Sequence, residues 1–322
     1  MAHVSTDKRR ETLIDRPTSW SLRCGGAAEA GVISSSLETV LGFYGVEIAH
    51  FSRPPGGRSR GRSPLEFRLA AAEGVPATRA QLAWRRPLFE WARSLELDLL
   101  LLPSSAARPP PLLCAFDGDG TLFAGETIDE IARLAGVGEA VATVTAAAMR
   151  GELDFENALR ERVRRLRGLP LARLGEIDER LPLMPGAQLC LATLKERGSS
   201  LALFTGGFRF FAAARAAELG IEHMLANQLA DDGRALTGEL EGVIVDAAAK
   251  EAGLRSLCLQ LDIPLARSLA CGDGANDLPM LDAAGTAIGF LPKDVLLDRL
   301  DGALFRGDWS ALDPLLPQPP CA

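Results

Sequence analysis

The sequence predicts an α/β protein in which a Rossmann-like parallel sheet follows a small ferredoxin-like α+β unit. After residue 111, short apolar runs alternate with helical segments, which is typical of a parallel sheet covered on both faces. Before residue 107, the pattern reads strand, helix, strand, strand, helix, strand. The prolines of ARPPP, residues 107–111, indicate a stiff connection between the two parts.

In the first part, strands are expected at residues 19–24, 46–52, 65–72 and 97–103, and helices at 28–44 and 77–95. The arginines of RSRGR, residues 58–62, allow an RNA contact, but the acidic chain favours a solvated loop. The expected boundaries are a flexible tail at 1–19, a first unit at 20–107, a linker at 108–111, a second unit at 112–313 and a flexible tail at 314–322.

In the second part, apolar strands are expected at residues 112–116, 200–204, 268–272 and 286–290. A mainly helical cap insertion, at about residues 127–184, interrupts the alternation. It begins with TIDE, in which Thr127 and Glu130 have the spacing of a capping box. Residues 227–242 carry Asp232-Gly233 between two strand-like arms, which predicts a hairpin.

Composition limits the partners of the chain. The 322 residues carry a formal net charge of -7, which argues against a nucleic-acid-binding surface. The six cysteines form no CxxC pair, so reduced thiols in a cytoplasmic protein are expected. The N-terminus lacks the apolar region of a signal peptide, and the longest apolar run, residues 97–103, is too short to span a membrane. Small molecules and proteins remain as partners.

Polar residues follow three of the apolar runs. Asp117 and Asp119 come after the first run, and Thr205-Gly206-Gly207 after the second. After the third run come Asp273, Asn276 and Asp277. Ligands of open α/β sheets bind outside the carboxyl ends of the strands, so the three motifs are expected to meet at one site.

Four carboxylates in one crevice predict a small hard cation. Asp117 and Asp119 leave an extended strand two residues apart and therefore point to the same side. With Asp273 and Asp277 they form an all-oxygen site that suits Mg²⁺. The EF-hand pattern excludes a calcium loop, because Thr121 and Leu122 stand where that loop needs Asp or Asn and Gly.

The other motifs indicate phosphate. FTGGF supplies a hydroxyl group, unobstructed backbone N–H groups and the start of a helix, and Lys250 adds a positive charge. Together with the carboxylates, these groups predict phosphoryl transfer. Asp117 would attack phosphorus and form an aspartyl-phosphate, and Asp119 would protonate the leaving group and later activate water.

Each motif has an ordinary alternative. DGDG alone is most often a solvated turn, TGGF a glycine-rich turn into a helix, and GDGAND a capped loop. A lone Lys250 would be a surface residue. Their occurrence in this order, after three successive apolar runs, favours the shared site.

The motifs resemble the haloacid dehalogenase superfamily of phosphatases, whose signature is Asp-x-Asp-x-Thr, Thr/Ser-Gly-Gly, a lysine and Gly-Asp-Gly-x-Asn-Asp. GETIDEIA and AMRGELDFENALRERV are similar to the phosphoserine phosphatase branch, and the resemblance runs from residue 113 to 316. Two departures occur. Thr205 replaces the usual serine and keeps its hydroxyl, whereas Gly120 replaces a serine common in the branch and weakens the substrate prediction.

The resemblance implies a role for each motif residue. Asp117 is the nucleophile and Asp119 the acid/base. Mg²⁺ is held by the Asp117 side chain, the Asp119 carbonyl and Asp273, with support from Asp277. The residues that hold phosphate or orient the site are Thr205, Gly206, Gly207, Lys250 and Asn276. Those that recognise the rest of the substrate are Glu126 for its amino group, Arg162 for its carboxylate, and Met149 with Phe155 for the apolar side.

The resemblance therefore predicts a cytoplasmic, Mg²⁺-dependent phosphoserine phosphatase of serine biosynthesis. The amino and carboxylate groups of phosphoserine match the charges of Glu126 and Arg162. Without the resemblance, an exposed helix charge pattern explains Arg162 better, because Arg160, Arg164 and Arg165 lie beside it. The open alternatives are a phosphatase or phosphotransferase acting on another small phosphomonoester, and a non-catalytic regulatory module.

The first unit has the element order of the ACT domains found on some relatives. That order motivates the hypothesis of a serine effector bound to this unit. A homodimer is a further hypothesis.

Overall fold

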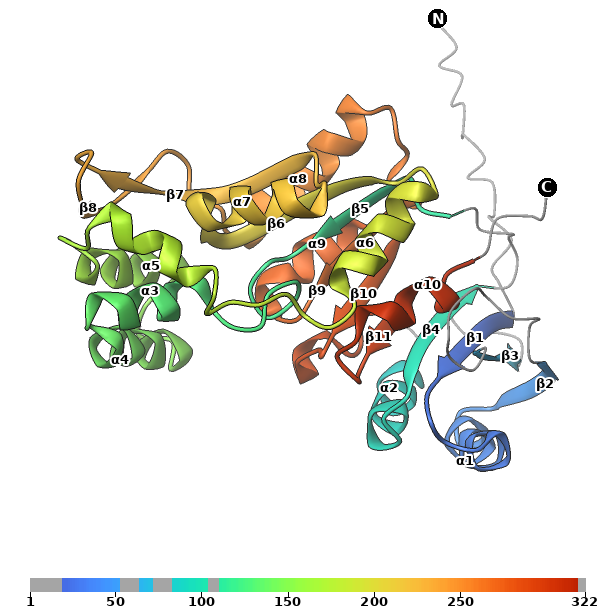
Figure 1. Ribbon diagram of the computed structural model, residues 1–322. Coiled ribbons are helices and arrows are strands. Elements are labelled where there is room, and N and C mark those ends of the chain that lie inside the picture. The colour runs from blue at the N-terminus through green and yellow to red at the C-terminus, as the bar shows by residue number, and fades with distance from the viewer. Residues whose placement is uncertain (1–18, 53–63, 72–82, 104–109, 318–322) are drawn as a thin grey trace, which may run out of the picture.

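The computed structural model describes residues 19–52, 64–71, 83–103 and 110–317. Eleven strands form one sheet in the order β2-β3-β1-β4-β11-β10-β9-β5-β6-β7-β8. Figure 1 shows an elongated molecule with a helical cap at one end, the parallel part of the sheet in the middle and an N-terminal unit at the other end.

The N-terminal unit has the predicted order of elements, namely β1 (Ser19–Gly25), α1 (Ala30–Gly42), β2 (Val46–Ser52), β3 (Leu65–Ala71), α2 (Arg85–Ser94) and β4 (Asp98–Pro103). Its strands are antiparallel in the order β2-β3-β1-β4, which confirms the ferredoxin-like prediction. Burial alternates along β1 because its second face is partly exposed. The RSRGR loop and residues 77–82 of the predicted second helix lie outside the described residues.

The parallel part contains the four strands that the sequence predicts, β5 (Leu113–Phe116), β6 (Ser200–Phe208), β9 (Ser268–Gly272) and β10 (Thr286–Phe290). Every residue of β5 is buried. Cys114 and Phe116 belong to the core on one face of the sheet, whereas Leu113 and Ala115 belong to the core on the other. The apolar run is continuous because both faces of the strand are covered.

Helices cover both faces of this part, and short 3₁₀ turns lie in several of its connections. The helices are α6 (Ala187–Glu196), α7 (Arg209–Leu219), α8 (Ala247–Gln260), α9 (Leu278–Ala283) and α10 (Leu312–Leu315). The 3₁₀ turns are η3 (Leu265–Arg267), η4 (Ala275–Asp277), η5 (Asp294–Leu296) and η6 (Trp309–Ala311).

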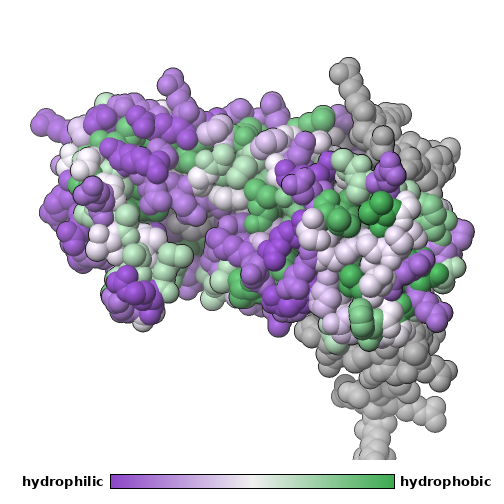
Figure 2. Space-filling view, turned by 90° about the horizontal axis from the view of Figure 1, so that it is seen from below, coloured by the Kyte–Doolittle hydropathy of each residue, from purple (hydrophilic) through white to green (hydrophobic). Residues whose placement is uncertain are grey.

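The cap consists of α3 (Thr127–Ala135), α4 (Gly138–Met149), α5 (Phe155–Arg165) and η2 (Leu171–Ile177). The predicted hairpin is present as antiparallel β7 (His223–Asp231) and β8 (Leu236–Glu241), with Gly233 at φ +84° in its turn. The hairpin joins the cap, since the Gly168 N–H donates to the Leu236 carbonyl at 2.8 Å. In Figure 2, hydrophilic residues predominate over the cap, and hydrophobic residues are more frequent toward the N-terminal unit.

The two parts share one sheet, which the sequence does not predict. Strand β11 (Gly302–Leu304) runs parallel to β10 on one side and antiparallel to β4 on the other. A Cβ on Gly302 would lie 2.8 Å from the Leu99 carbonyl oxygen, so glycine permits the close approach. One of the two hydrophobic cores contains residues of both parts, among them Trp20, Leu99 and Ala303.

Part of the expected C-terminal tail is packed. Leu315 and Leu316 are 2 % exposed, and the Arg23 guanidinium donates to the Leu316 carbonyl at 2.9 Å. No helix among the described residues is long and apolar enough to cross a membrane.

Candidate active site

The carboxyl ends of three neighbouring strands bring the predicted motifs together. Strand β5 lies between β9 and β6, parallel to both. Asp117 follows β5 directly, and its N–H donates to the Cys271 carbonyl of β9 at 2.9 Å. Asp273 follows β9, and Thr205 lies in β6. The prediction that the motif follows its strand is confirmed for Asp117 and Asp273, whereas Thr205 lies within β6, which extends to Phe208.

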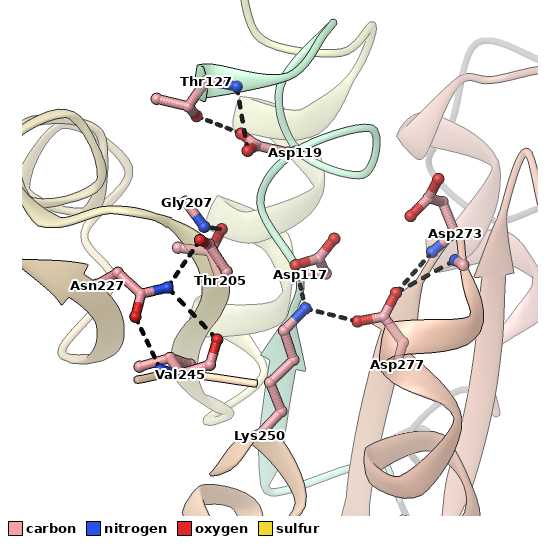
Figure 3. Close-up of polar contacts among 12 residues, drawn as sticks. Asp117, Asp119, Thr127, Thr205, Gly207, Asn227, Val245, Lys250, Asp273 and Asp277 are labelled. Carbon is pink, nitrogen blue, oxygen red and sulfur yellow. Dashed lines mark hydrogen bonds and ion pairs between the residues drawn. The ribbon is translucent and has the colours of Figure 1, made fainter. Parts of the chain in front are cut away.

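A buried lysine joins two of the carboxylates. Lys250 of α8 is 1 % exposed, and its Nζ lies 2.5 Å from Asp117 Oδ1 and 2.8 Å from Asp277 Oδ1. Figure 3 shows the ammonium group between the two side chains. Asp277 also accepts the backbone N–H groups of Asp273 and Gly274, each at 3.2 Å. The lysine therefore holds both carboxylates at the base of the site.

Burial controls the ionisation of this group. Burial, followed by the charge of Asp277, raises the pKa of Asp117, and Lys250 opposes that rise. Burial alone would lower the pKa of Lys250, but Asp117 and Asp277 raise it above its ordinary value. Lys250 thus stays charged and favours the ionised form of Asp117.

Asp119 occupies a different environment. Its carboxylate points away from the Lys250 cluster (Figure 3) and accepts hydrogen bonds from the Thr127 hydroxyl and, at 3.1 Å, from the Thr127 N–H. Burial raises the pKa of Asp119 to about 6, against the lowering effect of the Thr127 bonds. A carboxyl group that titrates near neutral pH is suited to proton transfer.

The Thr127 bonds overturn the capping-box prediction. Helix α3 begins at Thr127 with Glu126 as its N-cap, and no side chain caps it. The Thr127 hydroxyl is engaged by Asp119 instead, and Glu130 contacts Arg133. Thr127 of TIDE therefore connects the cap to Asp119 and does not cap helix α3.

The glycine-rich segment packs closely on Asp119. A Cβ on Gly207 would lie 3.1 Å from Asp119 Oδ2, and one on Gly118 would lie 2.8 Å from Thr205 Oγ1. The Thr205 hydroxyl accepts the Gly207 N–H at 2.9 Å. Asn227 of β7 fixes the segment from behind, because its side-chain amide donates to the Gly206 carbonyl at 2.8 Å.

Three carboxylates are arranged for a cation. One oxygen of each of Asp117, Asp273 and Asp277 lies within 4.8 Å of the others. An all-carboxylate donor set fits a hard divalent ion such as Mg²⁺. The Asp119 carboxylate is outside this cluster, so only its carbonyl remains as the predicted ligand.

Gly120 has a local structural reason. Its φ is +72°, in the left-handed region, and a Cβ there would lie 3.0 Å from Asp273 Oδ2. A side chain at this position would press on the carboxylate cluster. Glycine at this position therefore suits both the left-handed backbone and the close approach to Asp273.

Two opposite charges of the cap, Glu126 and Arg162, both lie near enough to Asp119 for its charge to act on them. Burial, with the charges of Asp119 and Asp273, raises the pKa of Glu126 to about 7. Burial lowers the pKa of Arg162, and the charge of Glu126 opposes this most strongly. The resemblance assigns Glu126 to the amino group of the substrate and Arg162 to its carboxylate, and these roles stay predictions.

Arg162 differs from the arginines around it. Arg160, Arg164 and Arg165 form surface ion pairs with Glu156 and Glu161. Arg162 is half-buried, and its Nε donates to the Ala158 carbonyl at 3.3 Å. Its neighbours fit the exposed charge pattern, whereas Arg162 is close enough to the site for the charges of Glu126 and Asp119 to act on it.

Phe155, Met149 and Asn276 are the remaining residues of the predicted substrate site, and their surroundings differ. Phe155 reaches the glycine segment, since its Cζ lies 3.6 Å from the position of a Cβ on Gly206. Met149 ends α4 with an exposed fraction of 86 %, and Asn276 is exposed on η4. The structure thus brings Phe155 to the glycine segment and leaves Met149 in solvent.

Sequence reasoning missed three residues of the site, Thr127, Asn227 and Lys293. In the sequence, Thr127 fits a capping box and Asn227 begins a predicted hairpin, so neither residue indicates a role in the site. Lys293 follows the predicted strand 286–290 and pairs with Asp273 at 2.8 Å. A polar residue after the fourth strand was a usable signal, because that strand also ends at the same edge of the sheet.

Comparison with known proteins identifies the family. A family model for haloacid dehalogenase-like hydrolases matches residues 114–282. The chain is a member of the haloacid dehalogenase-like hydrolases. The match includes Asp117, Lys250 and the GDGAND motif.

Individual relatives agree with this assignment. The chain is 39 % identical over 235 residues to the phosphoserine phosphatase of Archaeoglobus fulgidus. The aligned region covers 73 % of this chain and 68 % of that protein. A crystal structure of a HAD family hydrolase from Salmonella enterica serovar Typhi has a TM-score of 0.78, with 27 % identity, and covers 92 % of this chain and 98 % of that one.

A second solved structure is a phospho-aspartyl intermediate analogue of phosphoserine phosphatase. It has a TM-score of 0.58 and 38 % identity, and it covers 63 % of this chain and 97 % of that one.

Proposed function

We propose that this hydrolase is a phosphoserine phosphatase, which converts O-phospho-L-serine and water to L-serine and phosphate. The observation that carries the substrate is the pair of opposite charges, Glu126 and Arg162, beside Asp119. An α-amino acid has one ammonium and one carboxylate group, and this pair offers each its counter-charge. The phosphoserine phosphatases among the relatives support the same substrate.

The reaction divides between two carboxylates. Asp117 forms a bond to phosphorus while the bond from phosphorus to the serine oxygen breaks, and Asp119 gives its proton to that oxygen. Asp119 then takes a proton from water, whose oxygen attacks phosphorus and releases Asp117. Thr205, the backbone of Gly206 and Lys250 stabilise the phosphoryl oxygens. The solved phospho-aspartyl analogue supports this covalent route.

We assign Mg²⁺ as the cofactor, held by Asp117, Asp273 and the Asp119 carbonyl. Asp277 supports this site, because it contacts Lys250 and accepts the Asp273 N–H. A bound divalent ion would neutralise phosphoryl charge and keep the reacting groups in line. Lys250 opposes the rise in the pKa of Asp117, Thr127 orients Asp119, and Asn227 holds the glycine segment.

The proposal extends to the setting of the enzyme. We place it in the cytoplasm, at the last step of serine biosynthesis. Cys24, Cys114, Cys190, Cys258 and Cys271 are free and buried, as expected for a reducing compartment. A serine effector at the N-terminal unit and a homodimer remain hypotheses. The first is tested by calorimetry with L-serine on the full chain.

The substrate is tested by phosphate release. With Mg²⁺ present, kcat/KM for L-phosphoserine should exceed that for a panel of phosphomonoesters lacking an amino or carboxylate group. Equal activity on the panel would favour the alternative of a phosphatase with another small substrate. No release from any of them would favour a non-catalytic module.

The covalent step is tested by Asp117→Asn. This change removes the nucleophilic carboxylate and should lower kcat by about 10³-fold or more. Activity equal to that of the unaltered enzyme would contradict the aspartyl-phosphate.

A further inference from the structure

Lys293 places a second ammonium group at the carboxylate cluster. Its Nζ lies 2.8 Å from Asp273 Oδ2, and its N–H donates to the Asp273 carbonyl at 2.9 Å. The side chain also passes Gly274, where a Cβ would lie 3.1 Å from Nζ. Its charge acts on Glu126 as well. Lys293 therefore forms an ion pair with a carboxylate of the proposed cation site, and its charge also acts on the carboxylate assigned to the substrate amino group.

The segment after Lys293 is bound by hydrogen bonds and ion pairs to the N-terminal unit. This segment, residues 294–301, contains η5 and packs beside α2. Arg86 donates to Asp298 Oδ2 from Nε at 2.9 Å and from Nη2 at 2.5 Å, and to the Asp294 carbonyl at 3.0 Å. Arg93 donates to Asp294 Oδ1 at 2.6 Å. Two arginines of α2 thus hold the residue that directly follows Lys293.

A buried contact anchors the far end of the same segment. Arg85 is 4 % exposed, lies 3.6 Å from Asp301 and donates to the Leu300 carbonyl. Asp301 accepts the Ala287 N–H at 3.0 Å, and its carbonyl accepts the Leu101 N–H at 2.7 Å. The segment is therefore fixed to α2 along its length and to β4 and β10 at its end.

An ammonium group on Asp273 opposes cation binding at the same carboxylate. A divalent ion needs the Asp273 oxygens as ligands, and its charge is repelled by the ammonium. Lys250 differs, because it contacts Asp117 and Asp277 from within the core and is 1 % exposed. Lys293 is 61 % exposed and approaches from the open side.

We propose that Lys293 competes with the divalent cation for Asp273, and that Arg86 and Arg93 of α2 are positioning residues that keep Lys293 there. The inference rests on the cation site of the proposed function. It makes the N-terminal unit a determinant of metal affinity, through the segment 294–301 and independently of any effector.

The test is a calorimetric titration of the full-chain protein with Mg²⁺ in the absence of substrate. Lys293→Gln should lower the dissociation constant about fivefold, because one competing charge is removed. Lys195→Gln is the matched control. Lys195 lies outside the site and forms a comparable ion pair, in which its Nζ lies 2.7 Å from Glu222 Oε1. The control should leave the constant unchanged.

The positioning role is tested by a double-mutant cycle. Arg86→Gln with Arg93→Gln should lower the constant about twofold alone and leave it unchanged when Lys293→Gln is present. Asp298→Asn removes the Arg86 pair from the other side and should act in the same way if the arginine variant is poorly folded. Arg255→Gln, which removes an exposed pair with Glu251, should have no effect.

Three results would overturn the inference. A constant that is unchanged or larger in Lys293→Gln would exclude competition. An arginine effect of the same size in both backgrounds would exclude positioning through Lys293. If the unaltered protein released phosphate but took up no Mg²⁺, the metal assignment and this inference would both be wrong, while the phosphatase assignment would stand.

Discussion

At the scale of single residues, the environment separates two carboxylates of the same chemical type. Asp117 contacts a buried ammonium, whereas Asp119 contacts a hydroxyl and an amide N–H. The first arrangement favours a charged nucleophile, and the second a group that exchanges protons. Thr127 is therefore as informative about the mechanism as the aspartates themselves.

Replacing Thr127 should impair catalysis more than binding. Thr127→Val keeps the volume of the side chain and removes its hydrogen bond to Asp119. We expect kcat to fall about tenfold with KM for phosphoserine nearly constant, and Thr127→Ser to restore most of the loss. Steady-state kinetics will show this. The control is Thr145→Val, whose hydroxyl bonds its own helix at Val141. A rise in KM alone would contradict the orienting role.

Arg162 should determine affinity for one substrate and not for another. Arg162→Ala removes the cation assigned to the substrate carboxylate, so KM for phosphoserine should rise about 30-fold. KM for p-nitrophenyl phosphate, which lacks a carboxylate, should change less than about twofold. Arg160→Ala, from the exposed face of the same helix, is the control. Equal effects on both substrates would remove the carboxylate role.

The sequence predicted the site residues that follow apolar strands. It missed those whose position depends on tertiary packing. Asp117, Thr205 and Asp273 follow apolar runs, so their meeting at one edge could be foreseen. Thr127 carries two compatible roles in its local sequence, and only the position of Asp119 decides between them. Lys293 follows the fourth predicted strand, which makes it a candidate for the site, but its ion pair with Asp273 depends on how the turn between them packs.

At the scale of elements, an aromatic cluster connects the C-terminal turn η6 to the catalytic strand. Trp309 stacks on Phe290 of β10 with centroids 4.6 Å apart and meets Phe116 of β5 edge to face at 5.4 Å. Its indole N–H donates to the Thr121 carbonyl at 3.0 Å. The loop that carries Asp117 and Asp119 is therefore held by Trp309, which is 188 positions from Thr121 in the sequence.

Trp309→Phe should destabilise the fold while keeping an aromatic ring in place. The Thr121 carbonyl loses its buried donor, which costs about 2 kcal/mol. Urea denaturation should show this as a lower midpoint with an unchanged slope. Phe43→Leu, at a side chain that is 85 % exposed, should change the unfolding free energy by less than about 0.5 kcal/mol. A midpoint like that of the unaltered protein would show that the hydrogen bond contributes little.

Strands with a clear pattern were predictable, and the strand that joins the two parts was not. The apolar runs of β5, β6, β9 and β10 are continuous because the sheet is covered on both faces. Strand β11 has only three residues, Gly302–Leu304, which is too short for a periodicity. Its pairing partners, β10 and β4, come from distant segments and decide its conformation.

At the scale of the whole molecule, the N-terminal unit and the second part are joined by a shared sheet and a shared core. Strands β4 and β11 pair directly, and Trp20 of the N-terminal unit shares a core with Ala287 of β10. Arg306 adds a contact across the same boundary, since it donates to Asp98 Oδ2 at 2.6 Å. Removing the N-terminal unit would expose an edge strand and half of a core.

The two parts should therefore unfold together. Trp20, Trp84 and Trp91 lie in the N-terminal unit, so in a Trp309→Phe background all tryptophan fluorescence reports on that unit. Far-UV circular dichroism reports mainly on the larger second part. We expect both signals to give one midpoint in urea, because the shared sheet and core couple the parts.

Gly302→Ala should test which contact provides the coupling. A Cβ there would lie 2.8 Å from the Leu99 carbonyl oxygen and would force β11 away from β4. In this variant the fluorescence midpoint should move below that of the dichroism signal, because the N-terminal unit loses its edge. Gly31→Ala, on α1 where a Cβ meets nothing within 4 Å, should keep the signals coincident. Two midpoints already present in the Trp309→Phe background would mean that the parts are separate domains despite the continuous sheet.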